Sequence, residues 1–440
     1  MLIAPYITAA DPASFGAFTF RERLPKVVAQ VQAAVALQSG QVQALEALLG
    51  VIHQNQPLPP IDTTQVAAGA GWERFNQTYA GQMATQVPFS QVEAWFYTQI
   101  GIVLGYGADR SLDPFAPAKQ ASLQGSLPIL AEAAGRVRAL LAAQVPLAQA
   151  LPGLLRANLY GNTADLSQLA AHARTEVADE HLLLDRTPNL LAYLAPRTPL
   201  PRLDWLADNA GLELGLDLVL IYYLLASGAG RQVVLHVKHD PTFVSDATAQ
   251  DVRQHLAAFA AGAPPLQALA AALQQAITQG RLQIQDHPFW NGPWPFADLP
   301  RDLTRNHHLS IQTSSPSPLE GERGLGGEGV LPTHGRPQGD EGASPHAQKG
   351  SQSNDLFTSN LWVVKGDANY RRLLDDRAYD PTTPLADLLG YLPVPALMIR
   401  MLKSEMVAGL PAHLPSRLDG LDPAWRVNGH WGLLDFWQPA

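Results

Sequence analysis

The chain has 440 residues, of which 46% are hydrophobic and 16% are charged, so it can form one large domain or two smaller ones with sizeable cores. Its 30 basic and 39 acidic residues give a net charge of −9, which argues against a general nucleic-acid-binding protein, because such proteins depend on a basic face. The absence of cysteine excludes disulfides, zinc–thiolate sites and cysteine nucleophiles.

The N-terminal sequence MLIAPYITAADPASF has neither a basic segment nor a long apolar run, so no secretory signal is predicted. The longest strongly apolar run, from Leu212 to Ala226, includes two acidic residues and is too short to span a bilayer. We therefore expect a soluble, cytoplasmic protein. The sequence does not predict its oligomeric state.

Residues 19 to about 195 are predicted to be mainly helical. RERLP at 21–25 leads into an amphipathic stretch rich in Ala, Val and Gln, and 131–150 forms a further apolar-periodic segment. Proline-rich segments at 57–60 and 196–201 interrupt the pattern. We assign residues 1–200 to a mainly helical N-terminal domain.

From Arg202 onward, short β-rich runs alternate with helical patterns. Helices are predicted up to Leu225, from about Ala247, and over 368–374. The predicted strands are 203–206, 233–237, 361–364, 396–399 and 432–436. Alternating apolar strands and helices are typical of a sheet covered on both faces. Residues 201–440 are therefore predicted to form a doubly wound α/β domain.

A low-complexity stretch at 314–354 interrupts this domain. It is rich in Gly, Pro and Ser and nearly lacks aromatic and β-branched residues. Such a composition cannot bury enough apolar surface to offset the entropy of ordering the chain. We predict a disordered surface insertion.

Three polar clusters each follow a predicted strand directly. They are DNAGLE at 208–213, KHDP at 238–241 with Ser245 and Asp246 just beyond, and KGDANYR at 365–371. In open α/β sheets, ligands bind at the carboxyl ends of strands, beside helix N-termini that favour anions. The coincidence of three such clusters predicts one shared crevice.

The first cluster indicates an ion-binding site. The helix that follows it, GLELGLDLVLIYYLLASG, is apolar nearly all round, which predicts burial, yet Asn209, Glu213 and Asp217 share one stripe of it. Buried carboxylates are costly unless they are paired or bind a cation. Asp208, Asn209 and Asp246 together offer the oxygen ligands that suit a hard divalent ion.

Simpler structural roles compete with this interpretation. Asp208 or Asn209 could be a plain N-cap of the following helix. Asp246 could cap the helix within SDATAQDV, where Thr248 and Asp251 resemble a capping box.

Other residues near the clusters also have structural interpretations. Residues 365–367 could form a strand-exit turn. His236 lies in the middle of a predicted strand, so we interpret it as a core histidine, and we leave both it and His239 out of the metal site. Gly211 and Gly215 would let their helix approach the sheet or a ligand closely.

The motifs of this sequence resemble those of the metal-dependent damage-control phosphatases, the acidic-residue-methyltransferase-like or domain-of-unknown-function-89 group. The likeness extends nearly end to end, except that the 314–354 stretch has no counterpart. The motifs are FRERLPKVV at 20–28, DPFAPAKQASL at 113–123, LYGNTADLS at 159–167, DNAGLELGLDLVL at 208–220, HVKHDPTFVSD at 236–246, HPFW at 287–290 and KGDANYRRL at 365–373.

This resemblance implies a Rossmann-like α/β phosphatase domain with a helical N-terminal part. It implies hydrolysis of small phosphomonoesters in metabolite damage control, with sugar phosphates such as fructose 1-phosphate or fructose 6-phosphate as expected substrates. The expected cofactor is a divalent metal ion, namely manganese, cobalt, nickel or magnesium.

The resemblance also assigns site residues. Asp208, Asn209 and Asp246 match the metal ligands, and Asp208, Asp246 and Glu213 are the expected catalytic group. The expected substrate contacts are Glu213, Asp367, Asn369, Tyr370, Arg371 and Lys403. Lys403 belongs to a subfamily signature, Arg-Thr-x-Lys, which here has Met401 where a hydroxyl or thiol residue is usual.

In the mechanism that we expect, Lys403 and Arg371 hold phosphoryl oxygens at the metal site. Asp367, Asn369 and Glu213 contact the sugar-like part or orient water. The sequence leaves open whether Asp208 is a nucleophile or only a metal ligand. Two alternatives also stay open: an S-adenosylmethionine-dependent protein carboxyl methyltransferase, and a non-catalytic phosphometabolite-binding protein. The Gly-rich segment Ser227–Gly230 that a methyltransferase could use follows a helix, so a helix C-terminal turn is the simpler interpretation.

Overall fold

The computed structural model describes residues 4–107, 112–161, 181–299 and 359–439. The low-complexity stretch at 314–354 lies outside these ranges, so its predicted disorder stays a prediction.

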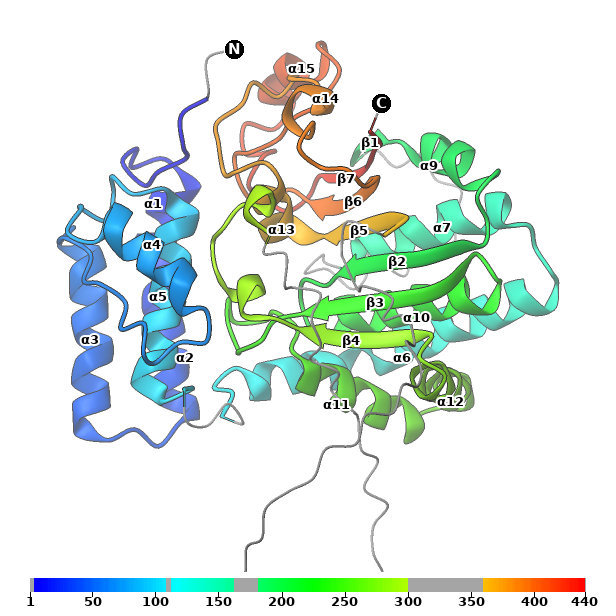
Figure 1. Cartoon of the computed structure of the whole chain (residues 1–440), viewed down its shortest axis with the longest axis horizontal. Helices are drawn as coiled ribbons and strands as arrows, with labels where there is room; N and C mark the ends of the chain where they lie inside the picture. The colour runs from blue at the N-terminus through cyan, green and yellow to red at the C-terminus, as the bar shows by residue number, and fades with distance from the viewer. Residues whose placement is uncertain (1–3, 108–111, 162–180, 300–358, 440) are drawn as a thin grey trace, which may run out of the picture.

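A group of helices near the N-terminus, which we call the helical body, lies beside one end of the central sheet (Figure 1). Its elements are α1 (Phe15–Phe18), the π-helical turn η1 (Thr19–Arg23), α2 (Leu24–Ala34), α3 (Ser39–His53), α4 (Gly69–Tyr79) and α5 (Phe89–Leu104). Trp95 and Phe96 of α5 belong to a core that also contains Trp362 and Met398 of the sheet. The helical body therefore packs on the sheet through a shared apolar core.

The central sheet has the strand order β1-β7-β6-β5-β2-β3-β4. All neighbouring pairs are parallel except β6 and β7, which are antiparallel. The strands are β1 (Leu182–Asp185), β2 (Leu200–Leu206), β3 (Gly230–Val237), β4 (Leu282–Asp286), β5 (Leu361–Lys365), β6 (Ala396–Met401) and β7 (Gly432–Trp437). The five strands predicted from the sequence are confirmed, whereas β1 and β4 were not predicted.

The order of the strands creates a switch point between β2 and β5. From β2 the chain continues outward to β3 and β4, and later it returns to the other side of β2 and continues outward from β5 to β6. Ligands of doubly wound proteins bind at the carboxyl ends of the strands at such a point. The topology alone therefore directs attention to the ends of β2 and β5.

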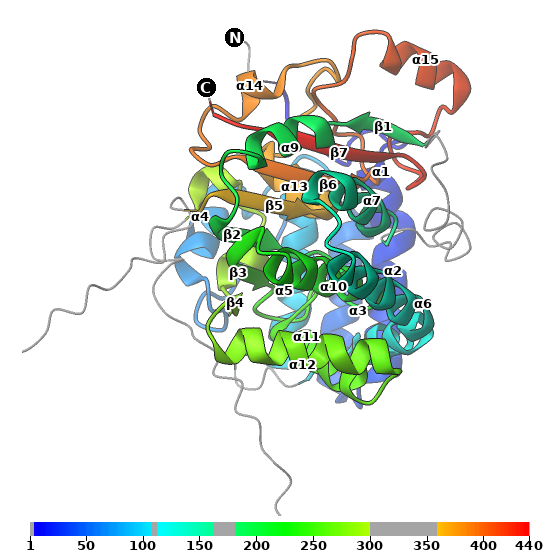
Figure 2. The ribbon, with the colours of Figure 1, turned by 90° about the vertical axis from the view of Figure 1, so that its right-hand side faces the viewer.

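Helices cover both faces of the sheet (Figures 1 and 2), which confirms the predicted doubly wound α/β fold. One face packs against α6, α7, α10, α11 and α12, and the other against α13 and the helical body. The helices outside the helical body are α6 (Ala116–Ala142), α7 (Leu147–Tyr160), α9 (Thr187–Leu194), α10 (Leu212–Ala226), α11 (Ala249–Ala260), α12 (Pro264–Thr278), α13 (Gly366–Leu373), α14 (Leu385–Leu388) and α15 (Leu414–Leu421), with 3₁₀ turns η2 (Pro288–Asn291) and η3 (Phe296–Asp298).

Two local predictions about helices have different outcomes. The apolar-periodic segment at 131–150 is divided between two helices, because α6 ends at Ala142 and Gln144 adopts φ +50° before α7 begins. The turn predicted at Ser227–Gly230 is confirmed, because Ser227 is the C-cap of α10 and Gly228 follows with φ +75°.

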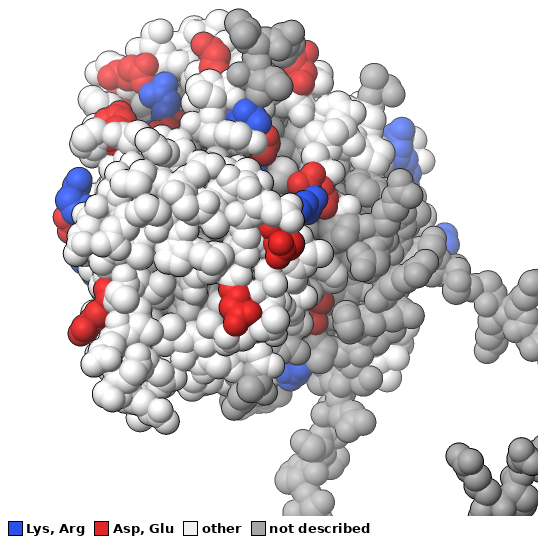
Figure 3. All heavy atoms as spheres, turned by 60° about the vertical axis from the view of Figure 1, so that its left-hand side comes forward, with Lys and Arg blue, Asp and Glu red and all other residues white. Residues whose placement is uncertain are grey.

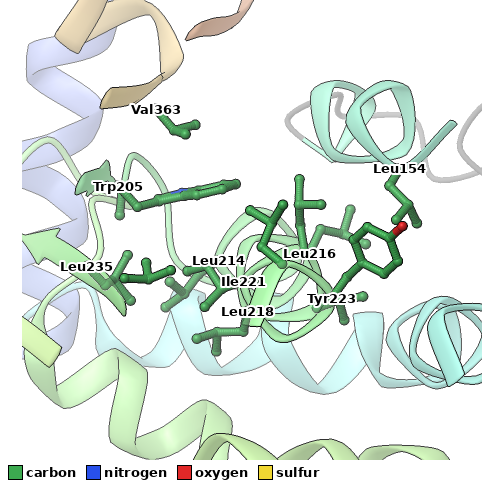
Figure 4. Close-up of a cluster of buried hydrophobic side chains, with 14 of the residues drawn as sticks. Leu154, Trp205, Leu214, Leu216, Leu218, Ile221, Tyr223, Leu235 and Val363 are labelled. Carbon is green, nitrogen blue, oxygen red and sulfur yellow. The ribbon is translucent and has the colours of Figure 1, made fainter. Parts of the chain in front are cut away.

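The helix α10 lies in the centre of the larger apolar core (Figure 4). Its Leu214, Leu218 and Ile221 are fully buried, and they belong to one cluster with Trp205 of β2 and Leu235 of β3. Leu130 of α6 lies so near Gly215 that a Cβ there would be 2.5 Å from its Cδ1. Gly215 therefore lets α10 lie close to α6 rather than close to the sheet.

The opposite face of the sheet carries a buried polar group. Arg202 donates two hydrogen bonds of 2.7 Å to Asp204, and His236 Nε2 lies 2.7 Å from Asp204 Oδ1. Although burial opposes it, these partners lower the pKa of Asp204. The interpretation of His236 as a core histidine is confirmed.

Asp435 on β7 provides a test of buried charge in the fold. Burial raises its pKa to about 7, and Arg186 only partly opposes this. A carboxyl whose pKa is raised on folding contributes stability that is present below its unfolded pKa and is lost as the pH rises through about 7. We expect Asp435→Asn to remove this dependence. Urea denaturation of the wild type and of the variant at pH 5 and pH 8 checks the prediction. It would be contradicted if the free energy of unfolding changed equally in both proteins between the two pH values.

The predicted domain boundary at residue 200 stays a prediction. The structure adds that α6, α7 and β1, which precede it, pack on or within the sheet. Within the described ranges, no helix has both the length and the apolar character needed to cross a membrane. Figure 3 shows a few scattered charged side chains, some with an opposite charge beside them, on the face that carries the helical body, in keeping with 16% charged residues.

Candidate functional site

The segments after β2 and β3 lie side by side at the carboxyl edge of the sheet. Asn209 and Asp246 form an antiparallel β-bridge, the Ala210 amide donates to the Ser245 carbonyl at 2.7 Å, and the Ala247 amide donates to the Asp208 carbonyl at 2.8 Å. The structure thus brings together the first two clusters that the sequence places at strand ends.

Asn209 connects the carboxylates of this edge. Its side-chain amide donates at 2.8 Å to both Asp208 Oδ2 and Glu213 Oε2, and its carbonyl oxygen accepts from Ser245 Oγ at 2.5 Å. Asn209 and Glu213 therefore lie side by side, as the sequence predicts for residues of one helical stripe. Asn209 orients two acidic side chains that would otherwise repel each other.

Asp208, Glu213 and Asp246 form a buried acidic group, which we call the carboxylate cluster. Their exposed fractions are 6%, 2% and 3%. Burial raises the pKa of Asp208 well above its usual range, and the charges of Glu213 and Asp246 raise it further. Burial likewise raises the pKa of Asp246 to about 6. Burial therefore opposes the charged forms of these carboxylates, and a bound cation would offset that cost.

Two buried lysines partly balance the carboxylate cluster. Lys238 Nζ lies 3.3 Å from Asp246 Oδ2 and donates to the Trp290 carbonyl at 2.9 Å. Lys365 Nζ lies 3.2 Å from Glu213 Oε1 and 3.3 Å from Asp217 Oδ1. Neither lysine was predicted as a site residue. Each ends or directly follows an apolar strand inside a polar cluster, which marks its place in the sequence but not its burial or its partners.

Neither aspartate of the predicted metal site is a helix cap. The N-cap of α10 is Gly211, without a side-chain cap hydrogen bond. The N-cap of α11 is Thr248, which forms the predicted capping box with Asp251. The capping box is confirmed, and the N-cap interpretations of Asp208 and Asp246 are wrong.

This separation of roles gives a testable contrast between neighbouring residues. Thr248→Ala removes the cap and should lower stability by about 1 kcal/mol while activity remains within a few-fold of wild type. Asp246→Asn should lower activity by about 100-fold or more. Thermal unfolding and phosphate release, measured on both variants, check the contrast. Equal losses of activity would show that the segment acts only through its structure.

The carboxylate cluster fits a hard divalent ion in its chemistry. Asp246 Oδ2 and Glu213 Oε1 are buried, and the described residues offer each of them a lysine at 3.3 and 3.2 Å but no well-oriented hydrogen bond. Carboxylate and amide oxygens are ligands that Mg²⁺ and Mn²⁺ accept. Among the described residues, no three Asp, Glu or His side chains already surround one point as ligands. The ligand atoms available in the cluster are therefore of the type that the predicted divalent ion prefers.

The end of β5 approaches the cluster at a glycine. Gly366 adopts φ +79°, and a Cβ at this position would overlap with the carboxylate of Asp208. Only glycine combines this backbone conformation with such a close approach. The 365–367 segment is therefore the start of α13 pressed against Asp208, rather than a simple exit turn.

Asp367 and Lys403 lie together beside this point. Asp367 Oδ1 accepts hydrogen bonds from Arg400 Nε at 2.8 Å and from the Lys403 amide at 3.1 Å. The Lys403 charge in turn lies near enough to lower the pKa of Asp208. Met401 of the signature is buried in the apolar core. The signature thus brings its lysine, but not its second residue, to the carboxylate cluster.

Arg371 makes contacts away from the carboxylate cluster. It donates to Asp376 at 2.8 and 2.9 Å and to Glu93 of α5 at 3.5 Å, and it lies over the Phe89 ring. Asp376 also accepts the Ser90 amide at the start of α5. Arg371 therefore connects α13 to the helical body, and its predicted contact with substrate stays a prediction.

Asn369 and Tyr370 likewise make contacts within the protein. Asn369 donates to the carbonyls of Ala207 and Lys365 at 3.0 and 2.9 Å, so it ties the end of β2 to the end of β5. The Tyr370 hydroxyl accepts the Ala408 amide at 3.3 Å. Both side chains hold the switch point together, and their predicted substrate contacts stay predictions.

A comparison with known families finds a match to the description "Damage-control phosphatase ARMT1-like domain" over residues 19–310 and 347–418, which is most of the chain. This match includes every residue of the carboxylate cluster as well as Asp367 and Lys403.

Individual relatives agree with this match. The chain is 24% identical to the Danio rerio protein named "Damage-control phosphatase ARMT1", covering 100% of this chain and 98% of that protein. It is 27% identical to the Mus musculus protein of the same name, covering 65% of this chain and 58% of the mouse protein. Among solved structures, a DUF89 family protein from Pyrococcus horikoshii is 11% identical with a TM-score of 0.43, covering 94% of this chain and 96% of that one.

Proposed function

The chain belongs to the ARMT1-like damage-control phosphatase family, and from this premise we propose that it hydrolyses sugar phosphates at the carboxylate cluster with the help of a divalent metal ion. As a member of this family it is a phosphatase that acts in metabolite damage control. The proposal adds the substrate class, the metal and the residues.

The observation that carries the proposal is the group of carboxylates buried together at the switch point. Asp208 and Asp246 lie on adjacent segments, and burial raises the pKa of both. Lys238, which lies 3.3 Å from Asp246, offsets this effect of burial only in part, so a bound cation would stabilise the charged forms of both carboxylates. We assign Asp208, Asn209 and Asp246 as the residues that hold the ion. When bound, a divalent ion supplies neutralisation of phosphoryl charge and activation of the attacking group.

The remaining residues bind and orient the substrate. Lys403, whose charge reaches Asp208, is our first choice for a phosphoryl oxygen contact. Asp367 fixes the position of Lys403 through its backbone amide. Arg371 supports Asp367 by its charge, while its guanidinium stays with Asp376. Glu213, held by Asn209 and Lys365, is placed to orient water or a substrate hydroxyl.

A substrate panel tests this function. Phosphate release would be measured with fructose 1-phosphate, fructose 6-phosphate and 4-nitrophenyl phosphate, each with manganese, cobalt, nickel or magnesium added to chelator-treated protein. We expect the sugar phosphates to have the highest kcat/KM. A clear preference for a phosphomonoester without a sugar part would contradict the proposed substrate class.

A further inference from the structure

A cavity of about 370 Å³ lies between the helical body and the carboxyl edge of the sheet. Its walls come from the segment 64–68, from α5 and the residues after it, and from the segments that follow β3 and β4. Its volume falls in the range of ligand-binding pockets. No residue of the carboxylate cluster lines it.

We propose that this cavity, which we call the Tyr106 pocket, receives the uncharged, hydroxyl-bearing end of the substrate while the phosphoryl group lies at the carboxylate cluster. The inference rests on the proposed function. It makes Tyr106 and Thr98 specificity-determining residues.

Tyr106 is the strongest sign of a ligand. The residue lines the cavity and is 7% exposed, and its buried hydroxyl has no hydrogen-bond partner among the residues that the structure describes. A buried hydroxyl that lacks a partner costs free energy, which a ligand hydroxyl in the pocket would recover. The nearby Gly101 leaves room for the ring, since a Cβ there would lie 2.8 Å from Tyr106 Cδ2. The ring of Tyr106 is therefore closely packed, whereas its hydroxyl group has no partner among the described residues.

The other walls fit a polar but uncharged group. Trp72 and Tyr97 offer aromatic surface, and Thr98 and Thr242 offer hydroxyl groups. Asp240 also lines the pocket. Burial raises the pKa of Tyr106, and the charges of Asp113 and Asp240 raise it further. An acidic wall repels a second phosphate and accepts hydrogen bonds from hydroxyls. The pocket therefore favours a monophosphate over a bisphosphate.

A single aromatic ring connects the pocket with the carboxylate cluster. The Phe243 ring lies 5.0 Å from that of Tyr97, which lines the pocket. Lys238, the partner of Asp246, lies 5.6 Å from the same ring. Phe243 is half-buried, and both it and Val244 adopt positive φ. The Phe243 ring therefore lies between the pocket wall and the cluster, and our proposal places the two ends of the substrate on either side of this ring.

Two variants test the pocket by binding and by turnover. Calorimetric titration of fructose 6-phosphate into chelator-treated protein measures binding without hydrolysis. We expect Tyr106→Phe to weaken the affinity about 5- to 10-fold, the effect of one hydrogen bond. Thr98→Phe, which fills the cavity, should weaken it at least about 10-fold. Thermal unfolding of each variant verifies the fold, and unchanged affinity in both folded variants would overturn the inference.

Turnover separates this inference from the proposed function. Both variants should raise KM for fructose 6-phosphate and leave kcat/KM for 4-nitrophenyl phosphate within about two-fold, because the aryl ester has no hydroxyl-bearing end. Wild type should also prefer fructose 6-phosphate to fructose 1,6-bisphosphate. Equal losses on both esters, or equal use of both sugar phosphates, would overturn the pocket. Absence of hydrolysis of every ester would overturn the proposed function, and the calorimetry would still decide on the pocket.

Discussion

Replacing Gly366 with alanine should nearly abolish phosphatase activity, because the new methyl group would occupy the position of the Asp208 carboxylate. A displacement of about 1 Å in a catalytic group can lower the rate about 100-fold, and we expect at least this loss. Stability should also fall by about 1–3 kcal/mol, since alanine is strained at φ +79°. Phosphate release and urea denaturation measure the two effects.

Gly228→Ala is the matched control for this variant. Gly228 adopts φ +75°, nearly the same as Gly366, but a Cβ there would meet no atom of the described residues within 4 Å. The control should therefore lose similar stability from backbone strain and keep its activity. If both variants lost activity equally, the loss would follow from destabilisation, and the contact between Gly366 and Asp208 would have no catalytic importance.

Asp208→Asn should lower activity by roughly 10²–10³-fold without lowering the stability of the metal-free protein. Burial and two neighbouring carboxylates raise the pKa of Asp208, so its charge is unfavourable in the folded state at neutral pH. Asparagine keeps the shape and removes that charge. Stability that is retained or increased while activity is lost is the pattern of a functional residue rather than a structural one.

Asp204→Asn supplies the opposite case four residues earlier in the chain. Asp204 is also fully buried, but Arg202 and His236 pair with it and lower its pKa. Removing its charge leaves Arg202 without a counter-charge, so stability should fall by about 3 kcal/mol or more. Urea denaturation of the two variants at pH 7 makes the comparison. A larger loss of stability in Asp208→Asn than in Asp204→Asn would contradict our assignment.

The sheet was largely predictable from the sequence because its central strands are short apolar runs followed by polar clusters. β2, β3 and β5 all follow this pattern, and their ends meet at the edge that the pattern predicted. β1 and β4 escaped prediction. Their burial is incomplete, with a half-buried pattern throughout β1, so local hydrophobicity marks them only weakly.

The acids of the candidate site and Lys403 were predicted from the sequence, whereas the buried lysines Lys238 and Lys365 were not. Carboxylates on an apolar helix stand out in a sequence, as Glu213 and Asp217 do. A buried lysine such as Lys365 looks like an ordinary surface residue at a strand end. Its partners Asn158, Glu213 and Asp217 come from α7 and α10, and only the tertiary packing brings these helices to one point.

The role of Arg371 could not be predicted from its motif. Its partner Glu93 lies 278 residues earlier in the chain. Asp376, its second partner, adopts φ +48° at the turn after α13. Motif spacing indicates that Arg371 belongs near the site, but the packing of the helical body decides which acids it contacts.

The most direct test of the account is the dependence of phosphate release on a divalent ion. Chelator-treated wild-type protein and the Asp208→Asn variant would be titrated with Mn²⁺ at a fixed concentration of fructose 6-phosphate. The account predicts no release without the ion, saturable activation of the wild type and almost none of the variant. Equal release from both proteins, with or without Mn²⁺, would contradict the assignment of the carboxylate cluster as the metal-dependent catalytic site.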